Sequence, residues 1–348
     1  MMAYPEAVRI IDLDDSGESL RESLLSHADS AKYVEKAKDY SSALIRSLER
    51  ISDFDLVHAH DWLTFEAALE IKRLTGKPLV VHIHSTEEDR STRGLVNPVV
   101  ATLERKGMDA ADRIVTVSRY AKERLARQYG QPLEKVELIY NATARSTEVP
   151  VRLPSSKVGS ITFLGRITEQ KGPKAFVEAA RGICSVVPNA RFVMAGDGDL
   201  LPMIHSLVNK LGMTEFFSFP GFLNQEEVVQ LLGQSRVLLM PSLSEPFGLV
   251  ALEAIRAGVP VVLSKYCGLI EHTPSVIRVD PMEVQEIVDA TISILRDPVK
   301  AQARAQVVAQ EAAHLDWTVS AKRLLLVYRA ALARNEAMAA GGGDSKNT

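Results

Sequence analysis

The 348-residue sequence contains only two cysteines, Cys184 and Cys267. Two thiols can build neither a disulfide framework nor a four-cysteine zinc site, so the sequence excludes both. No uncharged apolar run approaches the roughly 18 residues that a membrane-spanning helix needs. The first residues, MMAYPEAVRIIDLDD, lack the basic start and apolar core of a secretory signal. We therefore expect a cytoplasmic protein without a membrane span.

Neither sign of charge dominates the chain. It carries 41 Lys and Arg residues against 44 Asp and Glu residues, a formal net charge of −3. This balance lacks the basic footprint of a nucleic-acid-binding protein, so we expect no nucleic-acid partner. The length, together with a hydrophobic fraction of 46%, suits one large domain or two domains of about 150 residues each.

Short apolar runs alternate with helical stretches, which is typical of an α/β protein with parallel sheets. In the first half, strands are expected at Val8–Leu13, Leu56–Ala59, Leu79–Ile83, Ile114–Val117 and Val136–Tyr140. In the second half, they are expected at Ile161–Gly165, Arg191–Ala195, Phe217–Phe219, Val237–Met240, Pro260–Leu263 and Val276–Val279. Helices are expected between them, with a last helix at about Val319–Ala339.

A segment rich in Pro and Ser, without usable periodicity, interrupts this alternation once. We assign residues 1–144 to a first Rossmann-like domain, 145–157 to a linker and 158–316 to a second Rossmann-like domain. Residues 317–340 form the last helix, and 341–348 form a polar, glycine-rich tail that cannot pack. Two doubly wound domains that face each other form a cleft between the carboxyl edges of their sheets, where such folds bind ligands.

The stretch PSLSEPFGLVALEAIRAG at 241–258 combines an apolar helix with two carboxylates, Glu245 and Glu253. A helix that starts after Gly248 offers free backbone N–H groups and a positive dipole end to an anion. Glycine at this position lets a ligand approach the backbone closely. Alternatively, Glu245 only complements the helix dipole and Glu253 reaches solvent.

The stretch FLGRITEQKG at 163–172 brings Arg166 and Lys171 to the end of the first strand of the second domain. Two cations at this edge suit a diphosphate, although isolated surface charges are the ordinary alternative. The carboxylates then accept hydrogen bonds from hydroxyl groups on either side of the diphosphate. A diphosphate flanked by hydroxyl groups on both sides is a nucleotide sugar.

Four of the eight histidines form the pairs His58-x-His60 and His82-x-His84. Alternate residues of a strand share a face, so each pair can point the same way. The run HAHD at 58–61 is also typical of metal-dependent hydrolases, but that site needs a third ligand from a later strand. The remaining histidines fall mostly in helices or loops: His27, His205, His272 and His314. We therefore expect no metal, with His58 and His82 packed by one satisfied nitrogen each and His84 at the cleft edge.

The pair Glu245 and Glu253, preceded by FLGRITEQKG and VLLMPS, resembles the retaining glycosyltransferase family 4. Further matching stretches, spread over about 53–330, are VHAHDW, VVHIHSTEEDRS, IVTVSRYAKERL, PGFLNQEEV and GVPVVLS. The resemblance implies the GT-B fold, with an acceptor-side first domain and a second domain that binds the nucleotide sugar. It also implies transfer of a hexose to a sugar or polysaccharide acceptor without a cofactor or metal. HSTEEDRS is most similar to glycogen-synthase-like members.

The resemblance also implies individual roles in catalysis, donor binding and acceptor binding. Arg166 and Lys171 would neutralise the departing diphosphate, while Glu245 would hold hydroxyls of the donor sugar and Glu253 the ribose. The remaining implied site residues are His84 near the sugar, Gly165, Gly248 and Leu249 at the donor, and Asp61 and Trp62 near the acceptor. The last helix would cross back to the first domain, anchored by Trp317 and Tyr328.

One feature of the family's pattern is missing. Relatives begin with a strand and a Gly-Gly loop that closes over the donor, whereas this sequence has no Gly-Gly before position 341. We therefore expect an incomplete first domain. An active transferase, a nucleotide-sugar-binding remnant without turnover, a metal hydrolase and a nucleotide-sugar epimerase remain alternatives, of which the transferase fits the two glutamates best.

Overall fold

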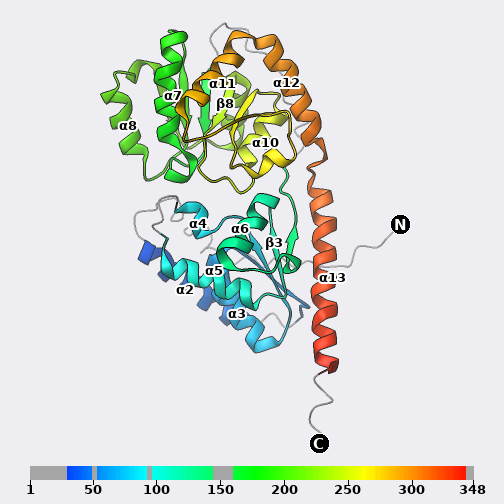
Figure 1. Ribbon diagram of the computed structural model, residues 1–348. Helices are drawn as coiled ribbons and strands as arrows, with labels where there is room; N and C mark the ends of the chain where they lie inside the picture. The colour runs from blue at the N-terminus through cyan, green and yellow to red at the C-terminus, as the bar shows by residue number, and fades with distance from the viewer. Residues whose placement is uncertain (1–29, 49–52, 92–95, 144–159, 342–348) are drawn as a thin grey trace, which may run out of the picture.

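The computed structural model describes residues 30–48, 53–91, 96–143 and 160–341. They form two α/β domains, each built on a parallel sheet flanked by helices (Figure 1). The expected strand Val8–Leu13, the linker at 145–157 and the tail after Gly341 lie outside the described residues. None of the described helices combines the length and the apolar character that crossing a bilayer requires.

The first domain contains a four-stranded parallel sheet in the order β1-β2-β3-β4. Its strands are β1 (Val57–His60), β2 (Leu79–Ile83), β3 (Arg113–Thr116) and β4 (Val136–Leu138). Its α-helices are α2 (Ser30–Ser47), α3 (Trp62–Thr75), α4 (Glu87–Arg90), α5 (Pro98–Ala110) and α6 (Arg119–Tyr129). One face of the sheet packs against α3 and α5 through Phe65 and Met108, both of which are fully buried.

The second domain contains a six-stranded parallel sheet in the order β10-β9-β8-β5-β6-β7. Its strands are β5 (Ser160–Leu164), β6 (Phe192–Ala195), β7 (Phe217–Gly221), β8 (Ser235–Met240), β9 (Val261–Ser264) and β10 (Ile277–Val279). The chain leaves β5 toward one edge and later returns through β8 toward the other. The switch point of this doubly wound sheet therefore lies between β5 and β8, where such folds form a ligand crevice at the carboxyl ends.

Helices cover both faces of the second sheet. They are α7 (Pro173–Val186), α8 (Leu201–Lys210), α9 (Gln225–Gln234), α10 (Leu249–Arg256), α11 (Val284–Arg296) and α12 (Pro298–Glu311). Short 3-10 turns complete the two domains: η2 (Leu133–Lys135), η3 (Glu169–Lys171), η4 (Thr214–Phe216), η5 (Gly268–Glu271) and η6 (Ala312–His314). Along β8, Val237 and Leu239 join the core under α7 and α11, while Leu238 and Met240 join the core under α10 and α12. This alternation explains why β8 reads as a continuous apolar run.

Helix α13 (Trp317–Gly341) follows the second domain and runs along the first (Figure 1). Val327 and Ala331 pack on the face of the first sheet that α3 and α5 do not cover. The Tyr328 hydroxyl bonds His58 Nδ1 at 2.7 Å, which confirms the expected anchoring role of Tyr328. Trp317 is 51% exposed, so the expectation that it is a second anchor is wrong.

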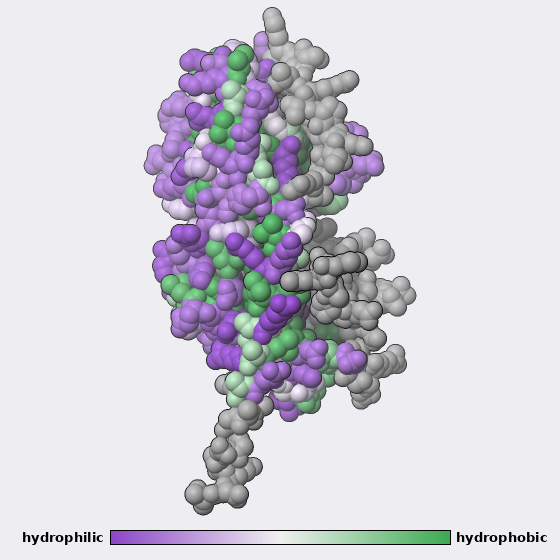
Figure 2. Space-filling model, turned by 90° about the vertical axis from the view of Figure 1, so that its right-hand side faces the viewer, coloured by the Kyte–Doolittle hydropathy of each residue, from purple (hydrophilic) through white to green (hydrophobic). Residues whose placement is uncertain are grey.

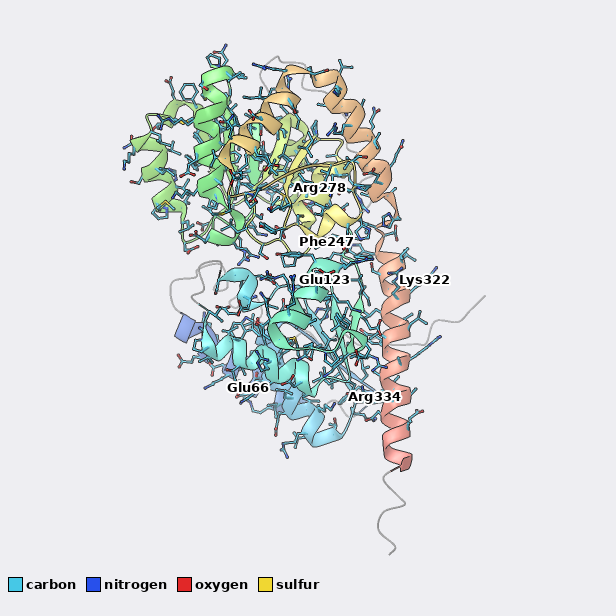
Figure 3. The ribbon with its side chains drawn as sticks, in the orientation of Figure 1. Glu66, Glu123, Phe247, Arg278, Lys322 and Arg334 are labelled. Atoms are coloured by element: carbon cyan, nitrogen blue, oxygen red, sulfur yellow. The ribbon has the colours of Figure 1, made fainter. Side chains whose placement is uncertain are left out.

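The two domains appear as separate lobes with a narrowing between them (Figure 2). Phe247 of the second domain joins Val117 and Ala121 of the first in one apolar cluster, and it lies across the boundary from Glu123 (Figure 3). The Ser118 hydroxyl donates to the Pro246 carbonyl across the same boundary. These contacts hold the carboxyl edges of the two sheets opposite each other.

Candidate active site

The loop after β8 leads into the amino end of α10 at the switch point. Gly248 begins the helix with φ 106°, a conformation that L side chains rarely adopt, and a Cβ there would lie 2.9 Å from Cys267 Sγ. Among the described residues, no side chain caps the first N–H groups of the helix, which start at Leu249. The positive end of α10 is therefore available to an anion.

Glu245 and Lys171 meet at this edge although they are far apart in the sequence. Lys171 Nζ lies 2.6 Å from Glu245 Oε2, and Glu245 is only 7% exposed. The backbone of Glu245 is fixed by bonds to Tyr266 O and from Gly268 N. The ordinary alternative, that Glu245 only complements the dipole of α10, is therefore insufficient, because its carboxylate has a direct cationic partner.

Glu253 lies on α10 and is partly buried. Burial raises the pKa of its carboxyl group. Within the described part of the chain, no hydrogen bond or ion pair satisfies this side chain. A partly desolvated carboxylate without a partner is costly in free energy, so its position is suited to hydroxyl groups of a ligand.

Arg166 follows β5, directly after Gly165, whose φ of 146° requires glycine. Burial lowers the pKa of Arg166, and the positive charge of Arg90 lowers it further, while Glu245 and Asp199 oppose the shift. Arg166 therefore lies within electrostatic range of cations and carboxylates from both domains. Such a cation is stabilised when an anionic ligand binds beside it.

Arg90 is a residue that the sequence analysis does not identify as part of the site. It ends the short helix α4, where its guanidinium lies 2.8 Å from Glu104 and 3.2 Å from Glu87. The charged run EEDR directly after β2 is the signal that points to it, because β2 ends at the carboxyl edge of the first sheet. Arg90 brings positive charge from the first domain toward Arg166.

Asp61 and His84 meet at the carboxyl edge of the first sheet. The backbone N–H of His84 donates to Asp61 Oδ1 at 2.9 Å, and burial raises the pKa of Asp61. Asp61 has φ 55°, an unusual conformation for a residue other than glycine, and such strain is concentrated at functional sites. Trp62 begins α3 and packs beside the core of the first domain. The structure thus brings Asp61 and His84 together, with Trp62 next to them.

The four histidines of β1 and β2 form one stack on the same face of the sheet. Successive ring centroids lie between 4.2 and 5.5 Å apart, and His60 stands beside His82 in the strand register. The expectation of one satisfied nitrogen is confirmed for His58, which bonds Tyr328. It is wrong for His82, because neither ring nitrogen has a hydrogen-bond partner among the described residues. Burial and neighbouring rings lower the pKa of His58 to about 3 and that of His60 to about 4.

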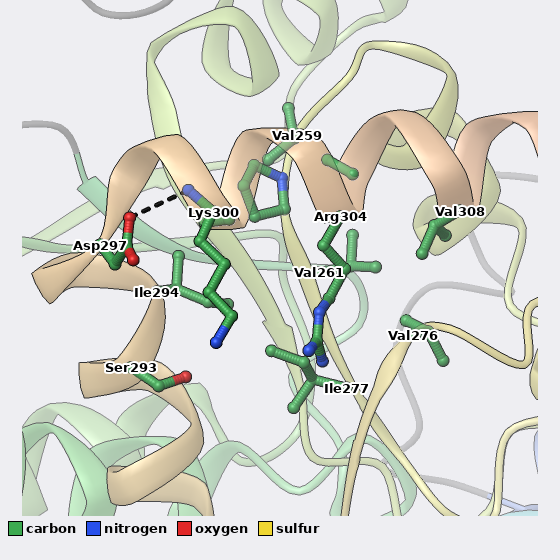
Figure 4. Close-up of a pocket in the computed structure, with 13 residues that line it drawn as sticks. Val259, Val261, Val276, Ile277, Ser293, Ile294, Asp297, Lys300, Arg304 and Val308 are labelled. Carbon is green, nitrogen blue, oxygen red and sulfur yellow. Dashed lines mark hydrogen bonds between the residues drawn. The ribbon is translucent and has the colours of Figure 1, made fainter.

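The described residues line two pockets whose positions can be compared with the predicted site. One of about 640 Å³ extends between the domains and is lined by Arg124 and Ser244, and by Gly172 next to Lys171. The other, of about 180 Å³, lies between α11, α12 and the amino ends of β9 and β10 (Figure 4). The second pocket is at the edge of the sheet opposite Glu245, so it is separate from the predicted site.

Comparison with known proteins identifies the family. The profile described as "Glycosyl transferases group 1" matches residues 147–312, and the one described as "Glycosyltransferase Family 4" matches residues 18–145. An uncharacterized glycosyltransferase of Methanocaldococcus jannaschii is 32% identical over 71% of this chain and 67% of its own length. The chain belongs to the group 1 glycosyltransferases. A glycogen synthase of Mycobacterium tuberculosis is 30% identical over 80% of this glycosyltransferase and 69% of its own length.

Solved structures confirm the GT-B fold of this glycosyltransferase. Sucrose-phosphate synthase of Thermosynechococcus elongatus has a TM-score of 0.74 at 21% identity, over 88% of this chain and 81% of its own. HepE of Anabaena, solved in complex with UDP and glucose, has a TM-score of 0.68 at 20% identity, over 82% of this chain and 80% of its own. The predicted fold class of two facing Rossmann-like domains is therefore confirmed.

Proposed function

We propose that this glycosyltransferase moves a hexose from a nucleoside-diphosphate sugar to a hydroxyl group of a carbohydrate acceptor, with retention of the anomeric configuration and without a metal at the donor. The observation that carries the proposal is the set of charges at the switch point. Lys171 and Glu245 form a close pair there, with Arg166 within electrostatic range of Glu245, and the loop that contains Glu245 leads into α10, which carries Glu253.

The cations supply the diphosphate subsite. Arg166 and Lys171 follow β5, and the N–H groups of α10 follow β8, so positive charge converges from the two central strands. A leaving diphosphate gains negative charge as its bond to the sugar breaks. Preorganised donors aimed at developing charge are typically worth about 10²- to 10³-fold in rate each.

The carboxylates supply the hydroxyl subsites. Glu245 is held rigidly by its ion pair with Lys171 and by its backbone bonds, which suits a group that orients the donor sugar. Glu253 has no protein partner among the described residues and suits the two ribose hydroxyls. Since carboxylates accept hydrogen bonds but repel phosphate, they are expected on either side of the diphosphate.

In the proposed reaction, the acceptor hydroxyl oxygen attacks the anomeric carbon from the face that the diphosphate leaves. The bond between that carbon and the diphosphate oxygen breaks, and the bonding electrons go to the diphosphate. The acceptor proton passes to the same departing oxygen, so no external base is required. Arg166 and Lys171 stabilise the charge that develops before this proton arrives.

The acceptor subsite is assigned to the first domain. Asp61 and His84 are fixed to each other at the carboxyl edge of the first sheet, and Trp62 begins the next helix. A carboxylate, an imidazole and an indole together suit a sugar, which presents both hydroxyl groups and an apolar ring face. Arg90 would add positive charge facing the diphosphate from this side.

A thermal-shift panel tests the donor subsite first. The panel contains UDP, ADP, GDP and their glucose conjugates, each measured with and without EDTA. UDP is the leading choice because HepE was solved with UDP. A ligand at about 100 times its dissociation constant should add roughly 2.7 kcal/mol to the free energy of unfolding. We expect one nucleotide to give this added stability equally in both buffers, and its sugar conjugate to be turned over with an oligosaccharide acceptor.

Other outcomes distinguish the alternatives. A nucleotide shift without turnover on any acceptor would favour a nucleotide-sugar-binding protein. The absence of a shift with every nucleotide, from a folded sample, would contradict the assigned donor subsite.

A further inference from the structure

The histidine stack of the first sheet contains unused ligand atoms. One nitrogen each of His58, His60 and His82 lies within 4.8 Å of the other two. These residues come from two adjacent strands, with His60 directly opposite His82 in the register. Their convergence is therefore fixed by the sheet rather than by long flexible side chains.

The hydrogen bonds within the stack leave one ring nitrogen available on His58 and one on His60. His58 Nδ1 bonds the Tyr328 hydroxyl at 2.7 Å, which leaves its buried Nε2 without a partner among the described residues. His60 Nδ1 bonds His84 Nε2 at 2.9 Å, which leaves the other nitrogen of His60 available. Histidines that bind metals usually hold their second nitrogen in this way, with a partner that fixes the ring.

The strongest evidence for a bound ligand comes from His82. It is 7% exposed, and both of its ring nitrogens are buried without a hydrogen-bond partner in the described part of the chain. A buried polar group without a partner costs free energy, and the two flanking histidines offer it no donor or acceptor. An ion bound by one nitrogen of each of the three rings would give one of the two His82 nitrogens a partner.

We propose that His58, His60 and His82 form a binding site for a zinc-like divalent cation, with a fourth position open to water. Imidazole suits Zn²⁺, and three histidines with an open position are a known zinc arrangement. Zinc–nitrogen bonds of about 2.0–2.1 Å place tetrahedral ligands about 3.3 Å apart, so nitrogen atoms that lie up to 4.8 Å apart must approach by up to about 1.5 Å. His60, which is exposed, has the most room to move, and His58 and His82 must adjust by smaller amounts within the sheet.

The metal would connect β1 and β2 of the first sheet to each other, to helix α13 and to His84. It would join β1 to β2 directly, and it would join α13 to the sheet through Tyr328 and His58. It would also fix His84 through the bond from His60. The site is separate from Arg166, Lys171 and Glu245, so this inference does not rest on the proposed transfer reaction.

The test uses the untagged full chain, first depleted of metal and then titrated with Co²⁺. We expect one tightly bound Co²⁺ per chain, with the visible absorption bands of tetrahedral coordination, displaced by Zn²⁺. His82→Leu should abolish this binding, while the melting temperature of the metal-free variant stays equal or rises because a buried unsatisfied group is removed. His60→Asn should also abolish it and, being an exposed substitution, should leave the fold intact.

Two further variants separate this site from other histidines. Tyr328→Phe keeps the ring but removes the partner of His58, and should weaken Co²⁺ binding by roughly 10–100-fold. His314→Asn is the matched control, because His314 bonds His272 at 2.9 Å in an exposed pair elsewhere. Weak binding without a tetrahedral spectrum, or tight binding that persists in His82→Leu and His60→Asn, would overturn the proposal. Loss of binding in His314→Asn alone would assign the metal to that other pair.

Discussion

The two sheets differ in the order of their strands. The second sheet runs β10-β9-β8-β5-β6-β7 and so reverses direction between β5 and β8, whereas the described strands of the first run β1-β2-β3-β4 without a reversal. A reversal lets two loops diverge at the carboxyl edge and leaves a crevice between them. Lys171 follows one of these strands and Glu245 follows the other, which explains why they meet in the second domain.

The two domains also differ in where they bury charge. Among the described residues, four carboxylates are at most 9% exposed, and three of them, Asp89, Glu104 and Asp112, belong to the first domain. Each of these three has cationic or N–H partners within that domain. Of these four, only Glu245 belongs to the second domain, and it lies at the carboxyl edge of that sheet. We therefore expect the buried carboxylates of the first domain to contribute mainly to stability, and we propose that Glu245 of the second domain contributes to ligand recognition.

Lys171→Met should have the largest effect on activity, and it tests the role of charge in the second domain. It removes a charge that we propose stabilises the leaving diphosphate, so kcat should fall by about 10²- to 10³-fold. The measurement is steady-state transfer from the donor that the thermal-shift panel identifies.

The double variant Lys171→Met with Glu245→Gln is the control for this prediction. The single change leaves a buried carboxylate without its partner, which is itself destabilising, and the double change removes both charges. We expect the double variant to regain stability but not transfer. Recovery of transfer in the double variant would show that Lys171 only neutralises Glu245.

Asp112→Ala tests whether buried charge in the first domain contributes to stability. Asp112 precedes β3, at the amino edge of the first sheet, and accepts bonds from Lys72 Nζ and Leu79 N at 2.7 Å each. Its loss should lower the free energy of unfolding by roughly 2–3 kcal/mol, because a buried N–H and a charged partner lose their acceptor. Urea unfolding measures this change, and nucleotide affinity should stay constant. Reduced nucleotide affinity in the folded variant would contradict the division between the domains.

An exposed ion pair provides the control for Asp112. Glu178 lies 3.7 Å from Lys174 on α7, and both side chains are at least 40% exposed. Because water screens this pair, Glu178→Ala should change the free energy of unfolding by less than about 0.5 kcal/mol.

Much of the fold could be predicted from the sequence. Buried parallel strands read as apolar runs, and the expected strand Leu79–Ile83 coincides with β2. The other described strands begin and end within about two residues of their expected positions. The small differences arise because the last residue of a strand differs from the first residue of the following loop only in its hydrogen bonds. Helix α12 gives little signal in the sequence, because its polar and alanine-rich surface lacks a strong apolar stripe.

The candidate site could be predicted only in part. Arg166 and Glu245 lie in the loops that follow apolar strands, so the sequence places both at a carboxyl edge. Their neighbours depend on strand order, which periodicity does not specify, and Arg90 of the first domain is absent from the prediction for that reason. The histidine stack likewise depends on the pairing of β1 with β2, which brings His82 between two histidines of another strand.

Glu253→Gln gives a smaller effect, on nucleotide binding alone. The amide keeps the shape but loses the charge that is proposed to accept the ribose hydroxyls, so affinity for the nucleotide should fall by roughly 10–100-fold. Burial raises the pKa of Glu253, so in the native protein this affinity should also fall as the pH drops through that raised pKa. Calorimetric titration across this pH range measures both effects.

The stability of the free protein should show the opposite pH dependence. A raised folded-state pKa means that the native state binds the proton more readily than the unfolded chain, so the contribution of Glu253 to stability rises as the pH falls. Glu253→Gln should remove both pH trends. Unchanged nucleotide affinity in this variant would contradict the ribose role.

Ser244→Ala gives the smallest expected effect and tests the boundary between the two domains. Ser244 Oγ of the second domain donates to Asp89 Oδ1 of the first at 2.8 Å and lies 3.2 Å from the Tyr120 hydroxyl. Asp89 keeps its bonds to Thr86 and its ion pair with Arg124, so the carboxylate stays satisfied and the cost should be only about 1 kcal/mol. Because the Ser244 hydroxyl is engaged by Asp89 and Tyr120 of the first domain, we expect its loss to affect mainly the alignment of the two edges, so kcat should fall by less than about tenfold while nucleotide affinity stays constant.

Ser275→Ala is the matched variant, since Ser275 Oγ donates to Glu311 at 2.6 Å entirely within the second domain. It should lower the free energy of unfolding by a similar amount, measured by urea unfolding, and leave kcat unchanged. An equal fall in kcat for both variants would mean that the Ser244 bond contributes general stability rather than alignment. A fall confined to Ser244→Ala would show that transfer depends on holding the crevice of the second sheet against the polar edge of the first.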